Sequence, residues 1–178
     1  MYLGAHGKAN ALDVIIESAK IIQNKNQYED IKFIFVGDGP KKEKLKEVKK
    51  KLTLENVEFL EPIKKKDVPL LLANADILLI SLKNISLYRY GISLNKLFDY
   101  MASRKPIIIA GDPSNNIINK ASCGISIPPE NSEKMAEAII KLYKMSPEER
   151  EEMGRRGYEY VKKNHDIPVL VDKLEKIF

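Results

Sequence analysis

The chain has 178 residues, of which 44% are hydrophobic, and this is enough for one globular domain with a sizeable core. No apolar run approaches the roughly 20 residues needed to span a bilayer, and no signal segment precedes the first apolar stretch. Much of the net charge of +5 lies in residues 41–51, where glutamates stand at helical spacing from lysines. We interpret this segment as a solvated helix face and expect no nucleic-acid partner, because no aromatic side chain interleaves the lysines.

Cysteine and histidine are scarce, and this bears on compartment and metal binding. Cys123 is the only cysteine, which excludes an intrachain disulfide and fits a reducing compartment. The remaining soft ligands, His6 and His165, are far from it in the sequence, so we expect no metal site. We therefore expect a cytoplasmic protein or a piece of a longer one. The basic charge also allows a peripheral contact to the inner face of the plasma membrane.

Short apolar runs alternate with helical patterns along the chain. The apolar runs predict strands at residues 2–4, 31–36, 57–60, 76–81, 105–110 and 124–127. Apolar periodicity and helix-start signals predict helices at residues 12–22, 41–51 after Pro40, 67–73, a short stretch that begins with Ser93, Asn95 and Lys96, and then 131–144, 146–164 and 166–178.

The strand-helix alternation predicts the fold class. Strands that are apolar throughout indicate a parallel sheet covered on both faces, and the alternation indicates a doubly wound, Rossmann-like α/β domain. We find no internal repeat or linker and assign residues 1–178 to one domain. Ligands of such sheets lie beyond the carboxyl ends of the strands, so the loops that line a site are those after Leu3, Val36, Leu60, Ser81, Ala110 and Ile127.

The segment Gly91–Pro106 carries the clearest chemistry on this predicted edge. The unpaired amides and positive dipole at the start of its helix suit an anion. Asp99 follows about one turn later, and a carboxylate beside a phosphate site suits a sugar hydroxyl better than a second phosphate. The segment therefore predicts a binding site for a nucleotide sugar.

Seven motifs then appear in one order and spacing. They are Gly37-Asp38-Gly39-Pro40, residues 56–60, residues 74–77, Asp99-Tyr100-Met101-Ala102 with Lys105-Pro106, Cys123-Gly124 ahead of Pro128-Pro129, residues 136–139 and Met153-Gly154. Each is weak alone, but together they cover nearly the whole chain. The set resembles the C-terminal, nucleotide-sugar-binding half of GT-B-fold retaining glycosyltransferases of the "glycosyl transferases group 1" family. The variant around Asn95 and Asp99 is similar to a subgroup that transfers amino-deoxy or acetamido sugars in surface-polysaccharide assembly.

The resemblance implies a role for each matching position of the α/β domain. Asp99 binds the ribose hydroxyls, Asn95 and Lys96 lend backbone amides to the diphosphate, and Lys96 adds a charge contact. Ile63, in the loop after the third strand, cups the base through backbone atoms. Gly7 and Lys8, in the loop after the first strand, approach the diphosphate. Gly37 and Ser93 complete the predicted substrate-binding set, and His6 and Lys8 are the catalytic candidates, with a plain loop histidine as the alternative for His6.

Three departures from the family pattern stand out. Gly91 occupies the place of a glutamate that faces the donor sugar in many members, so that contact is absent or supplied otherwise. Ala5 and Asn10 stand near the usual arginine and lysine of the first loop, so Lys8 and His6 would have to substitute for these cations. Arg104 replaces the glycine usually found before Lys-Pro.

The resemblance implies retaining sugar transfer without a bound metal or cofactor, in polysaccharide or lipopolysaccharide biosynthesis. Positive groups would stabilise the departing nucleoside diphosphate, and the sequence has no Asp-x-Asp pair to hold a divalent cation. UDP is the expected nucleotide on family frequency alone. In this fold the acceptor half precedes the donor half, so we expect that these 178 residues bind donor weakly and transfer nothing without it. The alternatives are a GT-B-type nucleotide-sugar epimerase and a non-catalytic doubly wound signalling module.

Overall fold

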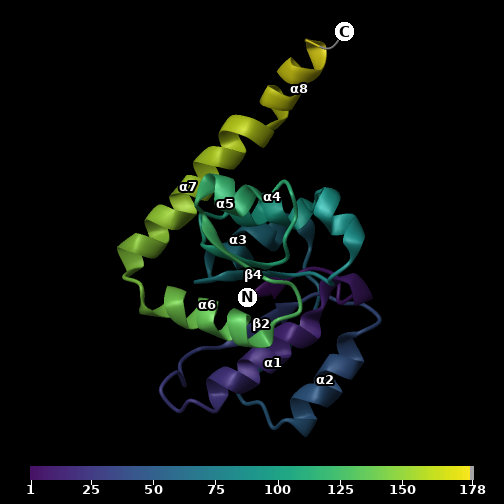
Figure 1. The fold of residues 1–178 in the computed structure, drawn as a ribbon, viewed down its shortest axis with the longest axis vertical. Coiled ribbons are helices and arrows are strands. Elements are labelled where there is room, and N and C mark those ends of the chain that lie inside the picture. The colour runs from purple at the N-terminus through teal and green to yellow at the C-terminus, as the bar shows by residue number, and fades with distance from the viewer. Residues whose placement is uncertain (177–178) are drawn as a thin grey trace.

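The computed structural model describes residues 1–176 and has two three-stranded parallel sheets enclosed by helices (Figure 1). The first sheet has the order β1 (Tyr2–Leu3), β2 (Phe33–Val36), β3 (Val57–Leu60). The second has the order β4 (Leu78–Ser81), β5 (Ile107–Ala110), β6 (Gly124–Ile127).

The two sheets meet between β1 and β4. The Leu79 amide donates to the Met1 carbonyl at 2.9 Å, and the Met1 nitrogen donates to the Ile77 carbonyl at 2.7 Å. The strands therefore follow one another in space as β3-β2-β1-β4-β5-β6, the order of a doubly wound domain, and the predicted fold class is confirmed. A continuous six-stranded ladder does not form because β1 is only two residues long.

Helices cover both faces of the sheets (Figure 1). One face carries α1 (Leu12–Gln23), α2 (Lys42–Lys51) and α6 (Ser132–Lys144). The other carries α3 (Val68–Ala73), α4 (Asn95–Ala102), α5 (Ile117–Ala121) and α7 (Pro147–His165). The last helix, α8 (Ile167–Glu175), extends away from this body.

Strand β5 shows how one apolar run serves two cores. Ile107 and Ile109 pack into the core under α4, whereas Ile108 and Ala110 pack into the core under α1 and α6. A strand in this position needs apolar residues on both faces, which is why the run does not alternate with polar residues.

Most predicted helices agree with the structure to within a few residues. The helix predicted from residue 146 is α7, which begins with a capping box between Ser146 and Glu149. The helix predicted at 166–178 is α8, and the last two positions of that range lie outside the described residues. Four short elements were not predicted: α5 and the 3₁₀ helices η1 (Lys8–Asn10), η2 (Lys65–Asp67) and η3 (Ser86–Tyr90). No helix within residues 1–176 is long and apolar enough to cross a bilayer.

The loop after β1, residues 4–8, is tied to the turn after β2 by backbone hydrogen bonds, and we call it the first loop. The Gly4 amide donates to Val36 at 3.0 Å, and the His6 amide donates to Asp38 at 2.7 Å. Gly37 lies between them with φ +133°, and a Cβ atom there would stand 2.1 Å from the Gly4 carbonyl oxygen. Glycine at position 37 is therefore required by the packing of these two backbones.

Replacing Gly37 with alanine should lower the free energy of unfolding by about 1–3 kcal/mol, because the added methyl group meets backbone and the φ angle is unfavourable. Urea denaturation followed by circular dichroism measures this change. Gly7→Ala is the matched control, since Gly7 has φ −98° and its Cβ would find only the Asn10 side chain at 3.7 Å. Equal stability losses in the two variants would contradict the packing argument.

Candidate functional site

The carboxyl ends of the strands form the edge on which nearly all of the predicted site residues lie. The first loop, the turn Gly37–Pro40 and the loop after β3 come to this edge from the first sheet. The amino end of α4 comes to it from the second sheet, and the side chain of Lys96 connects the two.

Lys96 reaches from α4 to the first loop. Its Nζ donates to the Tyr2 hydroxyl at 2.8 Å, lies 3.5 Å from Asn10 Oδ1 and stands 4.3 Å from the centre of the Tyr2 ring. A Cβ atom on Gly4 would be 2.7 Å from this nitrogen, so the glycine makes room for the ammonium group. None of the ion pairs among residues 1–176 includes Lys96.

The surroundings of Lys96 disfavour its charge. Burial lowers the pKa of the Lys96 ammonium to about 8. Tyr2 offers no compensating negative charge, because burial raises the pKa of its hydroxyl and that hydroxyl already donates to the Ala5 carbonyl at 2.7 Å. A largely buried cation without a carboxylate partner is costly, and an anion bound beside it would offset that cost.

Further anion-binding groups lie at the start of α4. Leu94 is the N-cap and makes no side-chain cap, and the amides of Asn95 and Lys96 have no acceptor within the described part of the chain. The side chains of Ser93 and Asn95 are exposed. The helix start therefore places two free amide donors beside the Lys96 side chain.

Asp99 lies one turn further along α4 and faces the segment that follows β3. Its exposed carboxylate lines a cavity of about 340 Å³ with residues of η2, α3 and the end of α4, namely Lys65, Val68, Pro69, Leu72, Ala73, Ala102 and Ser103. Ile63 is exposed in the loop that leads into η2. The structure thus brings the predicted ribose residue and the predicted base loop to neighbouring elements.

His6 does not share this exposed edge. Its ring is fully buried among Tyr2, Phe35 and Phe59, with ring centres 6.0 to 6.3 Å apart. Burial, and secondarily the charge of Lys42, lower the pKa of His6, and neither ring nitrogen has a hydrogen-bond partner among residues 1–176. The catalytic role of His6 stays a prediction, and this conformation gives its ring no path to a substrate.

Lys8 and Gly7 lie on a different side of the first loop from Lys96. Both line a cavity between η1, α1 and α2, and that cavity is not lined by Lys96, Asn95 or Asp99. Gly7 leaves open space at its Cβ position. The predicted roles of Lys8 toward the diphosphate and in catalysis stay predictions.

Gly91, which stands where many family members have a glutamate, ends η3 with φ +123°. A Cβ atom there would lie 3.2 Å from the Asn115 side chain. Asn115 accepts from the Ile92 amide at 2.9 Å and donates to its carbonyl at 2.8 Å. The chain therefore holds this loop with an amide from another segment, and a side chain at position 91 would be strained by the φ angle and would crowd Asn115.

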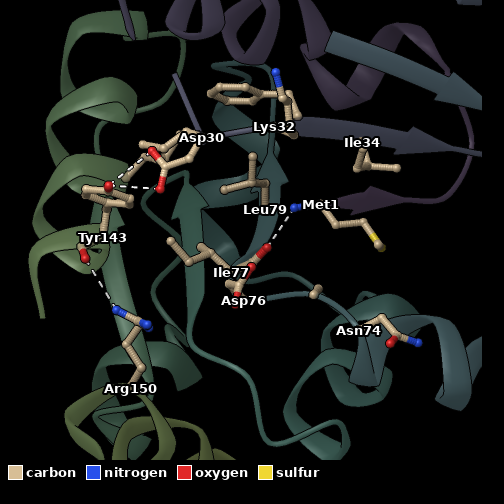
Figure 2. A pocket seen from close by; sticks show the side chains of 14 residues that line it. Met1, Asp30, Lys32, Ile34, Asn74, Asp76, Ile77, Leu79, Tyr143 and Arg150 are labelled. Atoms are coloured by element: carbon tan, nitrogen blue, oxygen red, sulfur yellow. Dashed lines mark hydrogen bonds between the residues drawn. The ribbon is translucent and has the colours of Figure 1, made fainter. Parts of the chain in front are cut away.

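A separate hollow of about 440 Å³ lies at the opposite edge, where β2 and β4 begin (Figure 2). Figure 2 shows Tyr143 pointing at Asp30, and its hydroxyl donates to both carboxylate oxygens at 2.9 and 3.0 Å. Arg150 donates to the carbonyls of Leu142, Tyr143 and Met145 at the end of α6. These polar groups stabilise the packing of α6, so the hollow offers few free groups for chemistry.

The described residues thus form a doubly wound α/β domain, with a cationic side chain and free helix amides at the carboxyl ends of the strands, where such folds bind ligands. Residues 1–160 match the family model described as "Glycosyl transferases group 1", and the chain belongs to this family. No curated protein sequence matches the chain.

Solved structures of glycosyltransferases share the fold. The C-terminal domain of the glycosyl transferase group 1 protein LpcC from Francisella tularensis is 20% identical, with TM-score 0.75, over 93% of this chain and 85% of that one. Anabaena Alr3699/HepE, solved with UDP-glucose, is 16% identical, with TM-score 0.80, over 99% of this chain and 48% of that one. WaaG, a glycosyltransferase of lipopolysaccharide biosynthesis, is 23% identical, with TM-score 0.75, over 99% and 46%. The chain therefore spans about half the length of HepE and WaaG.

Removing the Lys96 charge should stabilise the protein. Lys96→Met should raise the free energy of unfolding at pH 7 by about 1–2 kcal/mol, since Tyr2 keeps its hydrogen bond to Ala5 when the ammonium is gone. Below pH 8 the lysine is protonated in both states and the folded state bears the full penalty. Between about pH 8 and the unfolded pKa near 10.4, the folded protein releases a proton that the unfolded chain keeps, so the advantage of the variant shrinks.

Urea denaturation of both proteins between pH 7 and pH 10 measures this difference. Lys50→Met is the control, because Lys50 is an exposed residue of α2 and its replacement should change the unfolding free energy little at any pH. A Lys96→Met variant less stable than the parent at pH 7 would contradict the account of Lys96.

Proposed function

We propose that the chain is the donor-binding domain of a glycosyltransferase and binds a nucleoside diphosphate sugar, with a UDP-sugar as the expected donor. The observation that carries this proposal is the Lys96 ammonium, which is partly buried and has no carboxylate partner among residues 1–176, on a helix whose start has two free amides. Membership of the glycosyl transferases group 1 family supports the reaction class. The similar folds of HepE solved with UDP-glucose and of TarM from S. aureus solved with UDP support the donor class.

The residues around Lys96 explain two of the departures from the family pattern. Asn10, near the place of the usual first-loop lysine, directs its Oδ1 toward Lys96 Nζ and its Nδ2 to the Ala5 carbonyl at 2.8 Å. Ala5, near the place of the usual arginine, accepts from both Asn10 and Tyr2. We infer that the cation missing from the first loop is supplied from α4, with its ammonium group delivered to the same loop.

This arrangement suits the departure of a nucleoside diphosphate. When the bond from the sugar to the diphosphate breaks, negative charge grows on the diphosphate oxygens. A preformed ammonium in a poorly solvated place stabilises this charge more in the transition state than in the bound donor. The proposal is for a retaining, metal-independent transfer of a hexosyl or acetamidosugar residue, in which Lys96 and the amides of Asn95 and Lys96 hold the leaving group.

Asp99 and the loop after β3 complete the donor site in this proposal. The exposed carboxylate accepts hydrogen bonds from the ribose hydroxyls, and the backbone around Ile63 covers the base. Gly7, Gly37 and Ser93 remain members of the predicted binding set through their places on the loops at this edge. The base contact is made by main-chain atoms, so the choice of UDP rests on the similar structures.

In this proposal, a second domain of the whole enzyme carries the acceptor. We propose that the enzyme acts in polysaccharide or lipopolysaccharide biosynthesis. We place it in the cytoplasm, with a peripheral contact to the inner face of the plasma membrane. WaaG, which is similar in fold, acts in lipopolysaccharide biosynthesis. A nucleotide-sugar epimerase would need acid and base side chains in the cleft, and the burial of His6 lends it no support. Family membership favours a transferase over a signalling module.

Two variants and two probes test the donor site. Asp99→Ala should weaken UDP binding about tenfold, because the ribose contact is lost. The affinity for inorganic pyrophosphate, which has no ribose, should stay unchanged, so pyrophosphate should displace UDP more easily from this variant than from the parent. Lys96→Met should weaken both UDP and pyrophosphate about tenfold or more. Isothermal titration of UDP, followed by competition with pyrophosphate, measures both quantities. Glu47→Ala, which removes an exposed carboxylate from α2, away from the strand ends, should change neither. UDP affinity unaltered by both site variants would refute the proposal.

These 178 residues alone should bind UDP and transfer no sugar, because the acceptor and the groups that orient it lie on the second domain in this proposal. The measurement is product formation from radiolabelled UDP-glucose and UDP-N-acetylglucosamine with cell-envelope extract as acceptor. Heat-denatured protein serves as the blank. Sugar transfer above that blank would show that the acceptor domain is dispensable.

A further inference from the structure

A positively charged hollow opens where the first loop meets α2, and none of Asn95, Lys96 and Asp99 lines it. It has a volume of about 290 Å³, and the lysines that line it are Lys8 of η1, Lys41 and Lys44 at the start of α2, and Lys83 after β4. Asp13 of α1 also lines it and is the one carboxylate in its lining. We call this the basic hollow. Gly7 lines it as well, so one short loop contacts Lys96 through Gly4 and the basic hollow through Gly7.

The charges of the basic hollow are only partly balanced. Lys83 forms ion pairs with Glu130 at 2.6 Å and with Asp13 at 3.8 Å. Lys8, Lys41 and Lys44 take part in none of the ion pairs found in the described range of the chain. Lys41 and Lys44 are also neighbours one turn apart, where like charges repel. Three unbalanced ammonium groups around one small cavity favour a multiply charged anion over a single carboxylate.

The floor of the basic hollow is apolar. Leu12 of α1 and Leu45 of α2 are buried beneath it, and Val48 of α2 lies half-buried at its side. An inorganic anion would contact the lysines and leave uncovered the half-buried Val48 side chain and the small exposed parts of Leu12 and Leu45. An occupant that carries a short hydrocarbon next to its anionic group satisfies both the charge and the apolar surface.

We propose that the basic hollow binds the phosphoryl group of an amphiphilic phosphate ester, with the ester carbon chain against Leu12, Leu45 and Val48. Such a group has two sources, a soluble ester and a phospholipid headgroup in a bilayer, and both present the same chemistry. The proposal goes beyond donor binding and does not depend on Lys96. It gives Lys8 a partner other than the donor diphosphate.

Hexyl phosphate, titrated calorimetrically into the UDP-saturated chain, is the first test. It should bind more tightly than inorganic phosphate, because only the ester covers the apolar floor. Lys41→Gln/Lys44→Gln should weaken hexyl phosphate binding about tenfold while the affinity for UDP stays unchanged. The matched control is Lys50→Gln/Lys51→Gln, which removes two charges from the same helix outside the hollow and should stay within about twofold of the parent.

A flotation assay separates the two sources. Binding to phosphatidylcholine vesicles that contain phosphatidic acid, absent without that lipid and lost only in the Lys41/Lys44 variant, supports a bilayer headgroup. Hexyl phosphate binding without vesicle binding supports a soluble ester. Equal losses in the two double variants, equal affinities for hexyl and inorganic phosphate, or no binding of either probe would overturn the proposal. If UDP fails to bind, the titration without UDP still reports on the basic hollow, so the two proposals can fail separately.

Discussion

One partly buried cation, the ammonium of Lys96, joins the two halves of the domain at the carboxyl ends of the strands. It crosses from α4 to the first loop and meets a tyrosine hydroxyl, an amide oxygen and the face of an aromatic ring, but no carboxylate within residues 1–176. Each of these contacts is weaker than an ion pair would be. A fold selected for stability alone would place an uncharged side chain here, and this is why we propose that the ammonium serves to bind an anion.

The glycines at this edge are required by close packing within the chain itself. Gly4 makes room for the Lys96 ammonium, and Gly37 lets its own backbone approach that of Gly4. Gly39, with φ +148°, would meet the His6 backbone at 2.9 Å if it carried a Cβ atom. The first loop and the turn after β2 are thereby fixed against each other, so Gly7 and the backbone that the Lys96 ammonium approaches are held rigidly.

The sequence predicted the order of strands and main helices because each apolar run and helix period reflects burial along a single segment. Strand β3 and strand β6 have the predicted bounds, and the doubly wound topology follows from the alternation. The short elements η3 and α5 were missed because they lack a periodic apolar face long enough to detect. Their backbones are held by contacts made across the fold, such as that of Asn115 with Ile92.

The residues of the candidate site also fall into those that could be predicted from the sequence and those that could not. Asn95, Lys96 and Asp99 could be predicted because they share one helix start, where spacing fixes their relation. The depth of His6, the cavity around Lys8 and the approach of Lys96 to Tyr2 could not, because each depends on which residues distant in sequence pack together. A tyrosine in a two-residue strand carried no signal of its own until the structure placed Lys96, 94 residues away, against its hydroxyl.

Lys96 lies 94 residues from Tyr2 along the chain and contacts it in the fold. An anion requires a cation at one point in space, and any segment that reaches this point can supply it. Here the amide of Asn10 stands where a first-loop lysine is expected, and the ammonium arrives beside it from α4. In the proposed donor site, Lys96 meets this electrostatic requirement in place of a first-loop residue. A cation that is absent from a sequence motif can therefore be supplied by a segment that is distant in the sequence. This interpretation rests on the contact of Lys96 with Asn10.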